Sequence, residues 1–88
     1  MADPVMSRFE TPRLDRALNE SWPPDAATTP DRGPVPVRAR VVWQRAGVEL
    51  LDARATRWSG RSVFVTPTQG RSRNGALGVW LDAEDVRR

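Results

Sequence analysis

The sequence predicts a small, mainly β protein whose antiparallel strands close into a barrel. From residue 37 onward, apolar and polar residues alternate with a period of two, which is typical of strands with one buried face. Glycine-containing turn signals at Gly47, Ser59-Gly60 and Asn74-Gly75 separate the alternating runs. Residues 37–88 are too few to build a core under a flat sheet. Closure into a barrel also removes exposed strand edges, so a barrel is the expected architecture.

Composition divides the chain of 88 residues into an arm, residues 1–36, and a barrel, residues 37–88. Seven of the eight prolines lie in the arm, and proline at this density blocks the interiors of helices and sheets. The arm carries four arginines and six acidic residues, whereas the barrel carries ten arginines and five acidic residues. An acidic, Pro-rich arm is therefore expected to precede a basic barrel.

One short helix is predicted within the arm, over residues 12–20. Thr11 can cap it, and Pro12 suits the first helical position. A helix this short is marginal in water, because isolated helices need roughly 12–15 residues. We therefore expect it either to dock on its own barrel or to serve as a linear motif for a partner. The motif would consist of the apolar residues Phe9, Leu14, Leu18 and Trp22.

The predicted barrel contains four strands with one irregularity. The strands are expected over residues 37–43, 47–58, 61–66 and 76–81. In the second strand, Val48 and Leu50 share one alternation phase, whereas Leu51 and Ala53 follow the other. One extra residue would shift the phase in this way, so a β-bulge is predicted near Leu50-Leu51.

The C-terminal segment is predicted to form a capped single turn after the last strand. Asp82 can cap the turn, and Glu84 and Asp85 lie where the helix dipole favours anions. The stretch GVWLDAEDV, residues 78–86, resembles the last segment of SH3-like barrels (the SH3, Tudor and KOW class), which consists of a strand, a one-turn 3₁₀ helix and a short closing strand. The resemblance covers residues 37–88 and implies an SH3-like barrel of four to five antiparallel strands. It implies no functional residues.

Strand alternation predicts two faces of different chemistry. The interior is expected to hold the aliphatic phase together with Trp43: Val37, Ala39, Val41, Trp43, Leu51, Ala53, Ala55, Val63, Val65, Leu77, Val79 and Leu81. The outer face is expected to hold Arg38, Arg40, Arg54, Thr56, Trp58, Phe64 and Trp80. Arginine neutralises phosphate and exposed rings stack bases, so this face favours single-stranded nucleic acid. Arg71 and Arg73, on the loop before the last strand, are expected to add phosphate contacts.

Two alternatives to a nucleic-acid surface stay open at the level of sequence. Aromatic residues and arginine are also enriched at the centres of protein interfaces, so a protein partner fits the same composition. The arm can instead fold back and cover the aromatic face of its own barrel, because contiguous exposed apolar patches are unusual in monomers. In the partner hypothesis the chain is a bacterial or phage adaptor or inhibitor that uses the arm helix and the aromatic face.

The residue types argue against enzymatic and metal chemistry. The sequence lacks Cys, His, Lys and Tyr, so only carboxylates remain as general bases near neutral pH. Without Cys and His a zinc or haem site is not expected, and we predict neither a metal nor a cofactor. The adjacent acids Glu84 and Asp85 are better explained by the helix dipole than by a catalytic pair. We expect a non-enzymatic binding module.

Targeting and origin are predicted from two further absences. The first ten residues contain no apolar run of signal-peptide length, and the near-apolar run at residues 76–81 is too short to span a bilayer. The chain is therefore expected to be cytoplasmic and to have no membrane partner. Arginine replaces lysine throughout and isoleucine is absent, which indicates a high-GC bacterium or one of its phages.

Overall fold

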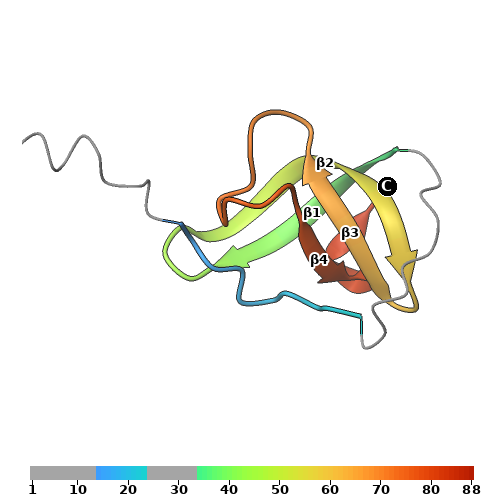
Figure 1. Ribbon diagram of the computed structural model, residues 1–88, viewed down its shortest axis with the longest axis horizontal. Coiled ribbons are helices and arrows are strands. Elements are labelled where there is room, and N and C mark those ends of the chain that lie inside the picture. The colour runs from blue at the N-terminus through green and yellow to red at the C-terminus, as the bar shows by residue number, and fades with distance from the viewer. Residues whose placement is uncertain (1–13, 24–33) are drawn as a thin grey trace, which may run out of the picture.

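The computed structural model describes residues 14–23 and 34–88, which form a five-stranded antiparallel sheet curled into a half-barrel (Figure 1). The elements are β1 (Val35–Trp43), β2 (Gly47–Ser59), β3 (Ser62–Pro67), β4 (Val79–Asp82), the 3₁₀ turn η1 (Ala83–Asp85) and β5 (Val86–Arg87). The strand order is β4-β3-β2-β1-β5. This confirms the prediction of a small, mainly β fold, and the arrangement is compatible with an SH3-like barrel. Within the described residues, no helix is long and apolar enough to cross a membrane.

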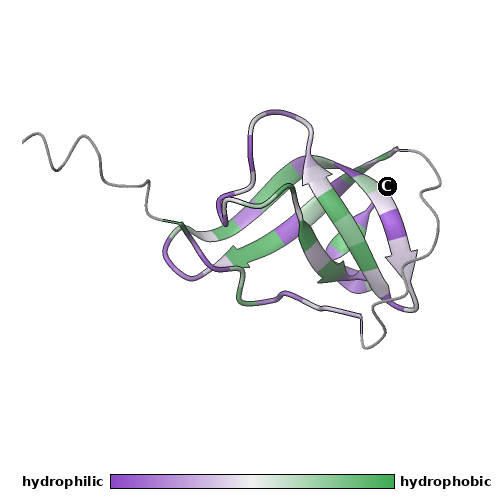
Figure 2. Ribbon diagram, in the orientation of Figure 1, coloured by the Kyte–Doolittle hydropathy of each residue, from purple (hydrophilic) through white to green (hydrophobic). Residues whose placement is uncertain are grey.

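The core lies inside the curl and follows the predicted alternation. All residues predicted for the interior are buried except Leu51, which packs partly buried against the core, and Leu77. Leu77 is 85% exposed because β4 begins at Val79, so Leu77 belongs to the preceding loop. Figure 2 shows the resulting bands of hydrophobic and hydrophilic residues along β2 and the mostly hydrophobic centre of β3.

The turns form largely where their residues predict them. Trp43 pairs with Gly47 at the end of the β1–β2 hairpin, and Gly47 takes the positive φ of 79° that glycine tolerates. At the C-terminus, the carboxylate of Asp82 accepts a hydrogen bond from the backbone N–H of Glu84 at 3.0 Å. The predicted cap and 3₁₀ turn are therefore confirmed.

The bulge predicted near Leu50-Leu51 is wrong. β1 and β2 pair without interruption there, with Arg40 opposite Leu50 and Ala39 opposite Leu51. The irregularity lies between Ala55 and Arg57, where β2 pairs with β3. Val48 and Leu50 are exposed on the outer face, so their apolar character does not indicate which residues of β2 face the core.

The described part of the arm, residues 14–23, which we call the strap, runs along the sheet in a non-helical conformation (Figure 1). Ala17 forms an isolated β-bridge with Trp43 of β1, and Glu20 forms one with Leu81 of β4. The backbone N–H of Leu18 donates to Val42 O at 2.7 Å, and that of Ser21 donates to Trp80 O at 2.7 Å. The strap therefore joins the edges of β1 and β4 and closes the open side of the half-barrel.

The helix expected over residues 12–20 is thus not formed in its described part, residues 14–20. Ala17 is buried in the core, but Leu14 and Leu18 are exposed, so the three residues do not share a buried face. Asn19 supports the extended path: its side-chain oxygen accepts from Val42 N and its amide donates to Arg40 O, both at 2.9 Å. Pairing with two strand edges satisfies backbone groups that a two-turn helix would leave largely unpaired.

Asp15 fixes the start of the strap to the β1–β2 hairpin loop. Its carboxylate accepts hydrogen bonds from the backbone N–H groups of Arg16, Arg45 and Ala46, each at 2.9 Å. Burial alone would raise the pKa of the Asp15 carboxyl, but these hydrogen bonds and the charge of Arg45 outweigh burial and hold the pKa below its ordinary value. The ionised form is therefore the one that holds the strap.

We expect acid to weaken the strap through Asp15. Because its folded-state pKa is lowered, its stabilising effect is complete above the unfolded pKa of about 3.9 and is lost as the pH falls through the folded-state pKa. Urea unfolding followed by Trp fluorescence at a series of pH values should show this loss, and Asp15→Asn should flatten the pH dependence. An Asp15→Asn variant with the same pH dependence as the wild type would contradict this assignment.

Candidate functional site

Five arginines lie on the outside of the half-barrel, and we call them the arginine face; four belong to β1, β2 and β5, and the fifth, Arg88, follows β5. Its members are Arg38, Arg40, Arg54, Arg87 and Arg88, all exposed. Arg38 and Arg40 point outward because Val37, Ala39 and Val41 fill the alternate, inward positions of β1. Strand pairing sets Arg87 opposite Arg38. Neighbouring strands thus bring together arginines that are far apart in sequence.

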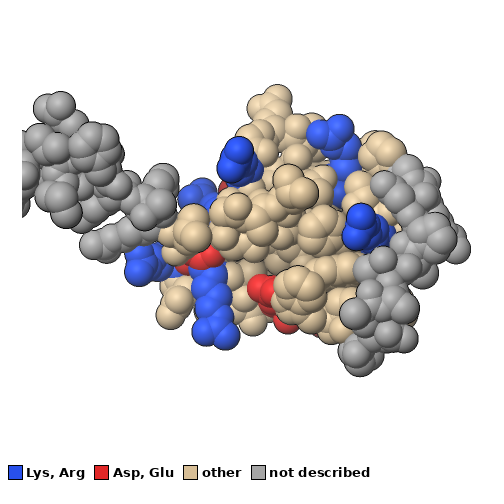
Figure 3. Space-filling view, viewed as in Figure 1, with Lys and Arg blue, Asp and Glu red and all other residues tan. Residues whose placement is uncertain are grey.

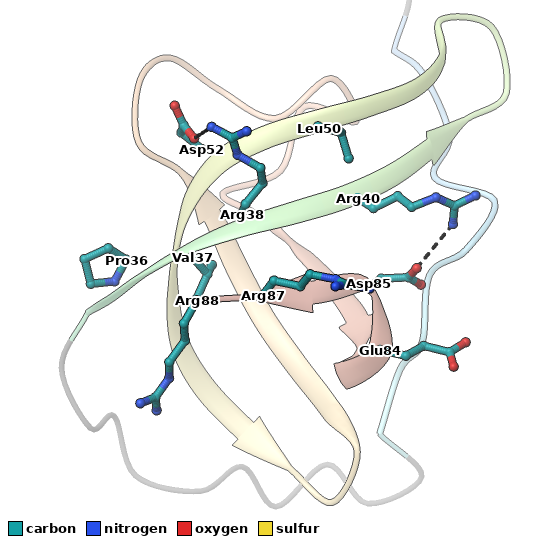
Figure 4. Close-up of a pocket in the computed structure, with 10 residues that line it drawn as sticks. All are labelled: Pro36, Val37, Arg38, Arg40, Leu50, Asp52, Glu84, Asp85, Arg87 and Arg88. Carbon is teal, nitrogen blue, oxygen red and sulfur yellow. Dashed lines mark hydrogen bonds and ion pairs between the residues drawn. The ribbon is translucent and has the colours of Figure 1, made fainter.

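A groove of about 770 Å³ runs across this face between β2 on one side and η1 and β5 on the other (Figure 4). Four members of the arginine face line it, all except Arg54. Pro36, Val37 and Leu50 supply apolar surface, and Asp52, Glu84 and Asp85 supply carboxylates. The groove therefore offers forked cations beside an apolar floor, a combination that can contact both a charged backbone and flat or aliphatic groups.

The arginines of the groove differ in how firmly they are held. Arg40 forms an ion pair with the largely buried Asp85 at 3.2 Å, and Asn19 of the strap donates to the same carboxylate at 3.1 Å. Arg38 pairs with Asp52 at 3.1 Å, but both side chains are mostly exposed, so this pair contributes little stability. Among the described residues, no carboxylate lies within ion-pairing distance of Arg87 or Arg88. Arg40 is fixed, whereas Arg38, Arg87 and Arg88 can turn to a ligand.

The aromatic residues predicted for the outer face are mostly covered. Trp58 lies opposite Val63 and packs partly buried against the core, because the bulge after Ala55 reverses the phase of β2. Trp80 does lie on the outer face, opposite Phe64, but it is only 5% exposed. Trp22 of the strap packs beside Trp80, with ring centroids 6.4 Å apart. Trp80 is therefore unavailable as a stacking platform, and Trp58 packs against the core instead of standing on the outer face.

The arm therefore folds back over the aromatic face of its own barrel in part. Phe64 contacts Trp80 with ring centroids 5.3 Å apart, and Trp22 extends this cluster outward while remaining 68% exposed. Leu14 and Leu18 are also exposed, so they do not cover the aromatic residues. Phe9, the remaining residue of the predicted arm motif, lies outside the described residues.

Sequence reasoning missed one arginine of the outer face. The bulge sets Arg57, rather than Trp58, opposite Phe64. Arg57 is exposed and thus lies beside the aromatic cluster of Phe64 and Trp80. Only the position of the bulge identifies Arg57, and that position follows from pairing with β3, which no local pattern in β2 indicates.

Arg71 and Arg73 are not brought together with the arginine face. They line a separate hollow beside the β1–β2 hairpin loop, together with Arg45. Arg73 donates through its Nε to the carboxylate of Glu49 at 3.3 Å, and the same oxygen accepts from Trp43 Nε1 at 2.9 Å. The predicted arginines therefore belong to two sites.

Neither a metal centre among the described residues nor a similar protein helps to identify the function of this site. Residues 14–23 and 34–88 contain no group of three acidic side chains placed to hold a metal ion. No family model matches the chain, and no similar curated protein or solved structure was found. The geometry and charge of the described residues are therefore the basis for a functional proposal.

Proposed function

We propose that the chain is a non-enzymatic binding module of SH3-like type whose arginine face contacts single-stranded nucleic acid. The observation that carries the proposal is the gathering of Arg38, Arg40, Arg87 and Arg88 around one groove, with Arg54 exposed on the neighbouring strand β2. Guanidinium groups bind phosphate oxygens through two parallel hydrogen bonds, and neutralising phosphates releases counterions from the nucleic acid. Backbone phosphates are thus the chemistry that this face fits.

The apolar floor of the groove favours a single strand over a duplex. Leu50 is exposed beside Arg38 and Arg40, and Pro36 extends the same surface. In a single strand the unstacked bases are free to lie on such side chains while the phosphates meet the arginines. In a duplex the bases are stacked and only their edges are accessible. Trp58 and Trp80 have no stacking role in this proposal, because Trp80 is buried and Trp58 packs against the core.

A salt titration tests the proposal. Binding of a short single-stranded DNA or RNA, followed by fluorescence anisotropy of the labelled oligonucleotide, should weaken linearly on a log–log plot against salt concentration. Replacing Arg38, Arg87 and Arg88 by Gln should reduce the slope by about 2, because each lost contact with a single strand removes about 0.7. The fold should persist in this variant, since the only ion pair among the described residues that it breaks is the exposed Arg38–Asp52 pair.

Arg16→Gln is the matched control for this titration. Arg16 is exposed on the strap and does not line the groove. Its replacement should therefore leave the salt slope close to that of the wild type. The proposal fails if the wild type does not bind at low ionic strength, or if the control lowers the slope as much as the triple variant.

A protein partner is the second candidate, and exposed apolar side chains of the strap favour it. Leu14, Leu18 and Trp22 each expose more than half of their surface. Apolar side chains exposed so close together in sequence are typical of interaction surfaces. Replacing Leu14 and Leu18 by Ser should abolish capture of such a partner and leave oligonucleotide binding unchanged, whereas the Arg38, Arg87 and Arg88 variant should do the reverse.

A further inference from the structure

A second hollow, of about 880 Å³, lies between the β1–β2 hairpin loop and the loop that precedes β4. Three arginines line it: Arg45 from the hairpin, and Arg71 and Arg73 from the long loop. Figure 3 shows arginine side chains gathered at the end of the molecule that the hairpin forms. The hollow and the groove of the arginine face have no lining residue in common.

The hollow also contains a buried hydroxyl that lacks a partner. Ser72 lies between Arg71 and Arg73, lines the hollow and is only 6% exposed. Within the described part of the chain its Oγ makes no hydrogen bond, whereas buried polar groups are nearly always hydrogen-bonded. Ser72 and the three arginines line the same hollow. A hydroxyl can donate a hydrogen bond to an anion and guanidinium groups bind anions, so an anion is the ligand that suits all four side chains.

The charge of the hollow is positive even though a carboxylate lies at its edge. Asp15 also lines the hollow, but its two oxygens already accept hydrogen bonds from the backbone N–H groups of the strap and the hairpin. Arg73 shares Glu49 with Trp43. Among the described residues, no carboxylate lies within ion-pairing distance of Arg45 or Arg71. These two cations are the ones free to bind a ligand.

We infer that this hollow is a phosphate-binding site in which Arg45 and Arg71 bind the phosphate oxygens and the hydroxyl group of Ser72 donates a hydrogen bond to them. Forked guanidinium groups match the geometry of a phosphate, and a monoester offers several oxygens to more than one arginine. Arg73 lies at the same hollow and connects it to the core through Glu49 and Trp43. The inference does not depend on nucleic-acid binding by the arginine face.

Titration of the ¹⁵N-labelled full chain with inorganic phosphate tests this site. The amide signals of Ser72, Arg73 and Ala46 should move, and so should the indole signal of Trp43, identified from a Trp43→Phe spectrum. Sodium chloride at equal ionic strength should not reproduce these shifts. Arg45→Gln with Arg71→Gln should weaken phosphate binding at least about tenfold, because both lost bonds are charge-assisted. Ser72→Ala should weaken binding without lowering thermal stability.

Arg57→Gln is the matched control, since this exposed arginine lines neither the hollow nor the groove of the arginine face. This control should bind phosphate like the wild type. The inference is overturned if phosphate causes no more shift than chloride, or if the shifts survive in the Arg45 and Arg71 variant.

Comparing the affinities of a 5′-phosphorylated oligonucleotide and its 5′-hydroxyl form identifies which kind of molecule carries the bound phosphate. A preference for the phosphorylated form that the Arg45 and Arg71 variant loses indicates a nucleic-acid end, and equal affinities indicate a small phosphate compound.

Discussion

Replacing Ala17 by Asp should destabilise the protein severely, because Ala17 is where the strap enters the core. Its side chain is 4% exposed, and its backbone forms the bridge to Trp43. An aspartate at this position would place an uncompensated charge among apolar side chains, which costs more than about 3 kcal/mol. A chain of this size has a total stability of only about 4–13 kcal/mol. We expect the urea midpoint, followed by circular dichroism, to fall sharply and the sample to aggregate as the edges of β1 and β4 separate.

The same substitution at the adjacent apolar residue, Leu18, provides the control. Leu18 is 58% exposed, so Leu18→Asp should change the free energy of unfolding by no more than about 0.5 kcal/mol. An amphipathic helix would have buried both residues and predicts that both variants are destabilised. Equal losses in the two variants would therefore contradict the extended strap, whereas a loss confined to Ala17→Asp would support it.

Gly78→Ala should also cause a large loss, because no side chain fits where the chain enters β4. A Cβ at this position would meet the backbone carbonyl oxygen of Val65 and would lie 3.0 Å from the ring of Phe64 and from the methyl group of Thr66. The carbonyl belongs to the backbone of β3 and cannot rotate away, so β3 and β4 must separate. We expect a loss of about 3 kcal/mol, measured by urea unfolding.

Gly60→Ala is the control for this second variant. A Cβ on Gly60 would enter open space, and only the positive φ of 57° opposes it. The expected cost is about 1–2 kcal/mol for an ordinary residue in the left-handed region. A smaller loss in Gly78→Ala than in Gly60→Ala would show that β4 is not packed against β3 as described.

Local alternation predicted most of the core correctly, although it misplaced the β-bulge and assigned the exposed Leu77 to the interior. Alternation in β1 and β3 identified core residues such as Val41 and Val65 because each strand has one consistently apolar face. The strap could not be predicted in this way. Its conformation is set by pairing with Trp43 and Leu81, which lie far along the chain, while its short apolar pattern also matches two turns of helix.

The candidate site was predicted in part for the same reason. Arg38 and Arg40 were assigned to the outer face from the alternation of β1, and both are exposed there. Trp58 was assigned to the wrong face because the bulge that reverses its phase is determined by β3. Trp80 was assigned to the correct face, but it is buried and lies beside Trp22 of the strap, a contact that no local pattern indicates. Sequence patterns therefore indicated which way a side chain points more reliably than what covers it.

The measurement that tests nucleic-acid binding by the arginine face most directly is a map of amide shifts in the ¹⁵N-labelled full chain on addition of a short single-stranded oligonucleotide at low salt. We expect the largest shifts in β1 around Arg38 and Arg40, in β2 around Arg54 and at the C-terminal Arg87 and Arg88, with little change near Trp58. Shifts centred on Leu14, Leu18 and Trp22, or no shifts at all, would contradict the proposal.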